Sequence, residues 1–135
     1  MDKGFEEIEH TADIAIRVWG RDLAELFANA AYGMACQMAD PDEVPRTVEQ
    51  AIELEACDAE TLLVTWLNEL LYLNERDGDV FVEFEMGQVT PTHVQAVVRG
   101  GPPPYQGLQI KAATFSDLKI APTDEGYETT VVFDV

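Results

Sequence analysis

Residues 58–75 read DAETLLVTWLNELLYLNE and carry more apolar surface than any other segment of the chain. Their apolar side chains recur at helical spacing and form one wide stripe, made of Leu62, Leu63, Trp66, Leu67, Leu70 and Leu71. Asp58 is a good N-cap residue, Glu60 suits the positive end of the helix dipole, and Gly78 offers a turn after the stripe. The stretch therefore predicts the central core helix.

The chain before this helix shows two strand patterns and a second helix pattern. Alternating apolar residues over 5–9 and 14–19 predict two short strands. Asp22, with Glu25 three residues later, is a variant of the capping box and predicts a helix. Pro41 stops that helix, because the residue before a proline avoids helical geometry.

The remaining patterns are those of strands. They cover residues 46–56, 80–86, 94–98, 108–112 and 118–120, and a last one runs from Tyr127 to the end. The run 100–104, Gly-Gly-Pro-Pro-Pro, predicts a surface loop, since proline cannot donate to a sheet. Two helices and many strands indicate an α+β fold, with both helices packed on one face of a largely antiparallel sheet. We expect a single domain over residues 1–135.

The chain is strongly acidic. Its 26 acidic and 8 basic residues give a formal net charge of −18. This balance argues against direct binding of nucleic acid, which depends on Lys and Arg at phosphates. It is compatible with a basic protein partner or a bound cation, although a solvated acidic surface is the better explanation of the charge taken alone. Without a signal segment or a long apolar span, a cytoplasmic protein that does not enter a membrane is expected.

The two cysteines, Cys36 and Cys57, have neither metal-ligand spacing nor the pattern of a disulfide framework. Each lies beside alanine in an apolar context. We therefore predict two buried free thiols.

The common catalytic motifs are absent from the sequence: there is no phosphate-binding glycine loop, no G-x-S-x-G and no H-E-x-x-H. Three features remain, namely H10-T-A-D13, Lys111 in an apolar context, and Asp134 next to the terminal Val135. Asp13, Asp134 and the terminal carboxylate would together form a hard oxygen site suited to Ca²⁺ or Mg²⁺. The alternative is that His10 and Asp13 serve a turn and that the acids are surface residues.

Five motifs resemble the archease family in order and over nearly the whole chain. They are H-T-A-D-I at 10–14, D-L-A-E-L-F-A-N-A-A-x-G-M at 22–34, W-L-N-E-L-L-Y-L at 66–73, I-K-A at 110–112 and F-D-V at 133–135. The resemblance implies an accessory protein of the RtcB-type tRNA-splicing RNA ligase. Such a protein helps the ligase acquire GMP from GTP and turn over repeatedly, and it is not itself an enzyme.

The resemblance also implies roles for particular residues. The family's metal positions match Asp13, Asp134 and Val135, and its functional lysine matches Lys111. His10 belongs to the same motif. One position departs from the pattern: many archeases continue the I-K-A motif with Tyr-His, where this chain has Phe115-Ser116.

Two other functions remain open from the sequence. One is a small stand-alone metal-dependent hydrolase that uses the same carboxylates, and it lacks an evident nucleophile. The other is a general chaperone-like module with its central helix exposed. The helix stripe matches a sheet well, which favours the accessory protein.

Overall fold

The computed structural model describes residues 4–8, 13–116 and 118–135. It contains α1 (Leu23–Met38), α2 (Ala59–Asp77) and a short 3-10 helix (Pro41–Glu43). The strands are β1 (Phe5–Ile8), β2 (Ile14–Gly20), β3 (Val48–Glu55), β4 (Val80–Thr90), β5 (His93–Gly101), β6 (Ala112–Thr114), β7 (Ala121–Thr123) and β8 (Gly126–Asp134).

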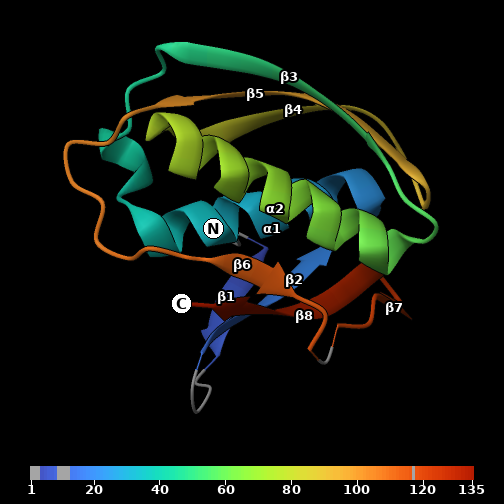
Figure 1. The fold of residues 1–135 in the computed structure, drawn as a ribbon. Helices are drawn as coiled ribbons and strands as arrows, with labels where there is room; N and C mark the ends of the chain where they lie inside the picture. The colour runs from blue at the N-terminus through green and yellow to red at the C-terminus, as the bar shows by residue number, and fades with distance from the viewer. Residues whose placement is uncertain (1–3, 9–12, 117) are drawn as a thin grey trace.

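The strands form two antiparallel sheets with the helices between them (Figure 1). One sheet has the order β1-β2-β8-β6, with β7 also paired to β8, and the other has the order β3-β5-β4. The α+β class and the antiparallel pairing are confirmed. The predicted single sheet is instead two, because α1 packs against β2 on one side and β4 on the other, so that its apolar surface is covered from both sides.

Both predicted helix starts are confirmed. The Asp22 carboxylate accepts a hydrogen bond from the Glu25 backbone N–H at 2.8 Å, and Asp58 accepts one from Thr61 at 2.8 Å. α2 continues to Asp77 and ends at Gly78, whose φ of +79° suits a residue without a Cβ.

The apolar stripe of α2 lies in the core. Trp66 is fully buried, and its indole N–H donates to the Phe27 carbonyl of α1 at 3.0 Å. Its ring packs against that of Phe84 from β4 in a T-shaped arrangement, with the ring centres 6.3 Å apart. One connected apolar cluster joins both helices to both sheets, and so α2 links the two layers.

Two predicted strands are shorter or displaced. Within 108–112 only Ala112 is in a strand, and residues 118–120 precede β7 rather than forming a strand. Side chains replace the missing ladder bonds there, because Gln106 donates to the Leu108 carbonyl and the Ile120 N–H donates to Glu60. The first two residues of the predicted 100–104 loop, Gly100 and Gly101, belong to β5.

Neither of the two cysteines, both of which the structure describes, forms a disulfide, as predicted, but the prediction that both are buried was wrong. Cys57 is exposed and Cys36 is partly buried. Cys57 lies at the surface turn immediately before the Asp58 cap, where the chain has not yet entered the core. Across the described residues, neither helix is long and apolar enough to cross a membrane.

Candidate functional site

The pairing of β2 with β8 brings Asp13 and Asp134 together. Its register runs from Ile14 opposite Phe133 to Gly20 opposite Tyr127. Asp13 directly precedes Ile14 and Asp134 directly follows Phe133, so the two acids lie at the same end of the two strands, one residue past the last pair of this ladder. Asp134 is still part of β8, whereas Asp13 lies just before β2.

The donor chemistry at this position fits a hard divalent cation. Asp134 is exposed and Asp13 is half-buried, so both carboxylates are open to solvent or to a partner. Among the described residues no three His, Cys, Asp or Glu side chains gather as a metal site. Val135, the third residue predicted for this site, directly follows Asp134 and is 38% exposed. Carboxylate oxygens are the ligands that Ca²⁺ and Mg²⁺ prefer.

Lys111 lies beside these acids along the backbone. Its N–H donates to the Asp134 carbonyl at 2.8 Å, and the next residue, Ala112, is paired with Asp134 in the ladder. The Lys111 side chain is exposed, and within the described ranges it forms no ion pair. The structure therefore brings Asp13, Lys111 and Asp134 to one end of the strands β2 and β8.

Two positions singled out in the sequence do not add to this geometry. His10 lies outside the described residues. Ser116 is exposed just beyond β6, where its N–H donates to the Thr114 hydroxyl at 3.2 Å. This contact stabilises the local turn that follows β6.

The sequence did not reveal the part that Asn68 plays. Its side-chain amide donates to the Ala113 carbonyl at 3.2 Å, and its carbonyl accepts from the Ala113 N–H at 2.8 Å. Asn68 thus pairs with the free edge of β6 as a neighbouring strand would, and it fixes the strand that follows Lys111. An amide among the leucines of α2 was the only signal in the sequence.

The fold and site define a class: small acidic α+β proteins with two helices between antiparallel sheets and carboxylates where two central strands end. A model of the "Archease protein family (MTH1598/TM1083)" matches residues 5–135. Protein archease of Methanosarcina mazei is 34% identical, with 98% of this chain and 97% of that protein covered. Protein archease of Archaeoglobus fulgidus is 37% identical, with 95% and 96% covered. The chain belongs to the archease family.

Two solved structures have the same fold. The solution structure of Methanobacterium thermoautotrophicum protein 1598 superposes with a TM-score of 0.82 at 28% identity, covering 99% of this chain and 100% of that one. The crystal structure of a Thermotoga maritima archease, described as a possible chaperone, gives 0.68 at 23% identity, with 96% of each chain covered. Because its sequence identity is low, the similarity to the Thermotoga maritima structure supports the fold alone.

Proposed function

We propose that this protein is an accessory factor of an RtcB-type tRNA-splicing RNA ligase. It promotes guanylylation of the ligase and lets the ligase turn over repeatedly, and it has no catalytic activity of its own. It works in the cytoplasm. The observation that carries the proposal is the β2–β8 register, which brings Asp13 and Asp134 to the same end of the two strands beside Lys111 in a chain of the archease family.

In this proposal Asp13, Asp134 and the terminal carboxylate of Val135 hold a divalent cation, Ca²⁺ or Mg²⁺. Three like charges held close together repel one another, and a bound cation relieves the repulsion. The cation would supply positive charge toward phosphate oxygens. Lys111 offers an ammonium at the same end of the sheet, where it helps to position the GTP phosphates at the ligase. His10 belongs to the same motif and is proposed to assist there.

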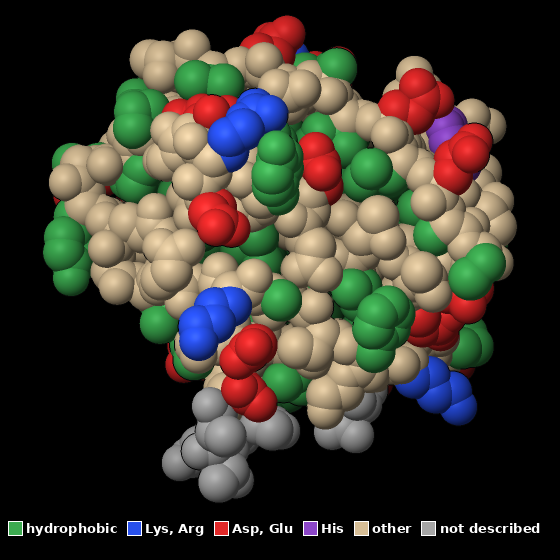
Figure 2. All heavy atoms as spheres, in the orientation of Figure 1, with side chains coloured by type: hydrophobic (Ala, Val, Ile, Leu, Met, Phe, Trp, Pro, Cys, Tyr) green, Lys and Arg blue, Asp and Glu red, His purple; other side chains and the backbone are tan. Residues whose placement is uncertain are grey.

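The acidity of the chain supports a basic protein partner. Figure 2 shows acidic side chains spread over the face that carries α2, with isolated basic side chains among them. Such a surface approaches a basic, RNA-binding enzyme by charge complementarity and does not compete with it for RNA.

The two alternatives have less support. A chaperone that uses the α2 stripe would need that stripe exposed, whereas Trp66, Leu67 and their neighbours are buried. A stand-alone hydrolase would need a nucleophile beside a base. The described part of the site offers carboxylates and a lysine, which bind and orient but give no evident attacking group.

The proposal is tested by multiple-turnover ligation with GTP, alongside calorimetric titration of Ca²⁺ and Mg²⁺. Asp13→Ala and Asp134→Ala are each expected to lose both metal binding and ligase stimulation, while keeping the fold. Lys111→Ala should lose stimulation and still bind metal, because an ammonium is no ligand for a cation. Asp42→Ala is the matched control, since Asp42 is an exposed acid on the 3-10 helix. Stimulation by Asp134→Ala equal to that by wild type would refute the proposed site.

A further inference from the structure

A cleft of about 740 Å³ lies at the other end of β2 and β8 from Asp13 and Asp134. It opens between the end of β2, the start of α1 and the turn that joins β7 to β8. Trp19 in the cleft comes six positions after Asp13, which is about 20 Å at the usual rise per strand residue. The cleft is therefore separate from the carboxylate site on the same sheet.

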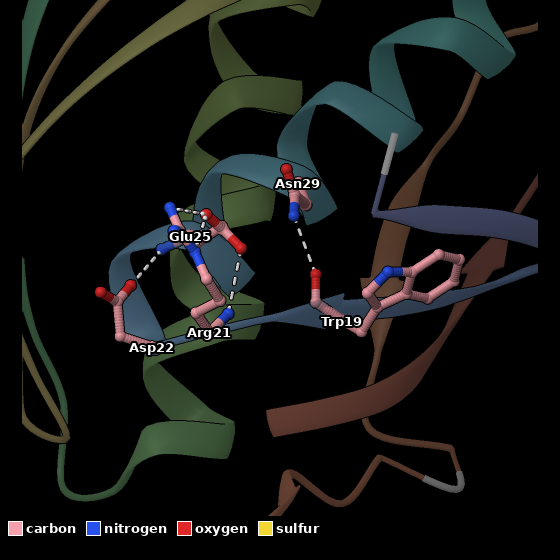
Figure 3. Close-up of polar contacts among 5 residues, drawn as sticks. All are labelled: Trp19, Arg21, Asp22, Glu25 and Asn29. Carbon is pink, nitrogen blue, oxygen red and sulfur yellow. Dashed lines mark hydrogen bonds and ion pairs between the residues drawn. The ribbon is translucent and has the colours of Figure 1, made fainter. Parts of the chain in front are cut away.

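Close backbone contacts join the elements that border this cleft. Gly126 has a φ of +147°, and a Cβ there would lie 2.1 Å from the Gly20 carbonyl oxygen and 2.6 Å from the Arg21 Cα. The start of β8 thus touches the β2–α1 turn without intervening side chains. Asn29 of α1 donates to the Trp19 carbonyl at 2.8 Å and ties the helix to the end of β2 (Figure 3). These contacts hold together the elements that border the cleft.

Both arginines of the cleft are already neutralised by carboxylates. Arg21 pairs with Glu25 at 2.9 Å and lowers the pKa of that carboxyl through a hydrogen bond (Figure 3). Arg17 bridges Glu6 at 3.2 Å and Glu128 at 3.1 Å. These contacts leave the arginines little unbalanced positive charge to offer an anion.

Two further carboxylates of the cleft remain unpaired. Asp124 and Glu125, at the exposed β7–β8 turn, form no ion pair with any described residue. With Glu25 and Glu128 they bring four carboxylates to a cleft that has two arginines. The excess charge is negative, so a cation fits.

Trp19 and Tyr127 are both among the residues that line the same cleft. They lie at successive positions of the β2–β8 ladder and so face opposite sides of the sheet, and Tyr127 packs against the core. Trp19 therefore forms the aromatic wall of the cleft. The Arg17 guanidinium already lies over the Trp19 ring, 5.5 Å from the ring centre. Guanidinium and ammonium groups are attracted to ring faces, and their alkyl stems pack on apolar surface. The wall is therefore suited to an arginine or lysine side chain.

We propose that this cleft binds a basic, extended segment of a protein partner, with an arginine or lysine held between the Asp124–Glu125 turn and the aromatic wall. Taking that partner to be the ligase rests on the proposed function above. The cleft would then anchor the partner at one end of the sheet, while the carboxylates at the other end meet the ligase active site.

The test titrates the whole protein with a capped hexa-arginine peptide. Binding is monitored by the NMR chemical shifts of the backbone amides and the indole groups. We expect saturable shifts at Trp19 and over residues 124–128, and none at the Trp66 indole, which is buried and bonded to Phe27. The double variant D124N/E125Q should weaken peptide binding by about three- to tenfold, since exposed charge pairs are individually weak.

The control is D42N/E43Q, which removes the same charge from the exposed 3-10 helix. Equal weakening in both double variants, or shifts that avoid the cleft, would overturn the proposal, because the peptide would then respond only to net charge. No ligase or metal enters this assay, and so its outcome does not depend on the carboxylate site.

The ligase assay then tests the partner. D124N/E125Q should raise the concentration that gives half-maximal stimulation, leave the maximum unchanged, and keep wild-type metal binding. A stimulation curve identical to that of wild type would overturn the assignment of this cleft to the ligase. By contrast, a loss of maximal ligase stimulation in D134A tests the carboxylate site. The two proposals can therefore fail independently of each other.

Discussion

Asn68 closes an exposed strand edge with one side chain. β6 is the last strand on its side of the sheet, and its Ala113 has both backbone groups bonded to the Asn68 amide. Asn68→Ala leaves these partly buried groups without partners, and we expect a loss of about 1–3 kcal/mol in unfolding free energy. Urea denaturation measures the loss, and hydrogen exchange at Ala113 should accelerate.

Asn68→Asp is the matched variant. It keeps the oxygen that accepts from the Ala113 N–H and loses the donor to the carbonyl, so its stability should fall between wild type and the alanine variant. If Asn68→Ala matched wild type in both stability and exchange, the edge of β6 would be held by other contacts.

Trp66 joins the two helices and the β3-β5-β4 sheet through its bond to Phe27 and its contact with Phe84. Replacing a fully buried aromatic residue with alanine leaves a cavity, and Trp66→Ala should cost about 3–5 kcal/mol. Chemical denaturation measures this cost. Tyr72→Ala on the same helix is the control: Tyr72 is 53% exposed, and losing its solvent-exposed contact with the Arg76 guanidinium should change the stability far less.

At the scale of elements, the N-cap of α2 makes stability depend on pH. The bond from the Thr61 N–H lowers the pKa of Asp58 below its ordinary value of 3.8. Because the pKa is lower in the folded state, the charged cap stabilises the fold above the unfolded pKa. This contribution disappears as the pH falls through the folded value.

Asp58→Ala should therefore be less stable than wild type at about pH 7. The difference in unfolding free energy between the two proteins should become smaller toward about pH 2.5. Asp58→Asn keeps a capping oxygen without a titrating group, and its cap should persist at both pH values. Urea midpoints at the two pH values measure the difference. A gap between wild type and Asp58→Ala that is independent of pH would contradict a charge-dependent cap.

The helices were predictable because their signals are local. Asp22, Asp58 and Gly78 act on backbone groups within a few residues, and the apolar period of α2 spans several turns. The structure of residues 108–112 and 118–120 was harder to predict from the sequence. The Glu60 carboxylate of α2 accepts a hydrogen bond from the N–H of Ile120, which lies 60 positions later in the chain. A local sequence pattern cannot predict a partner that far away.

At the scale of the whole molecule, a net charge of −18 opposes the compact state. Raising NaCl from about 10 mM to about 300 mM screens this repulsion and should raise the melting temperature. At equal ionic strength CaCl₂ should raise it further, since a cation that binds only the folded state adds stability. Calorimetry measures both shifts.

The extra effect of Ca²⁺ should vanish in Asp134→Ala, while the effect of NaCl remains. Asp42→Ala serves again as the control and should keep both effects. If Asp134→Ala retained the full additional shift with CaCl₂, the cation would be acting on the diffuse acidic surface and not at the proposed site.

The amino-acid sequence by itself determined the two helices, their caps, the α+β class and the identity of the candidate residues Asp13, Lys111 and Asp134. Tertiary structure decided the rest. Two sheets enclose the helices because α1 is covered from both sides, and the β2–β8 register brings Asp13 and Asp134, 121 positions apart in the chain, to the same end of the two strands. Asn68 at the edge of β6 and the cleft at Trp19 likewise depend on segments far apart in the sequence, whose meeting is fixed by strand pairing and core packing and not by local periodicity.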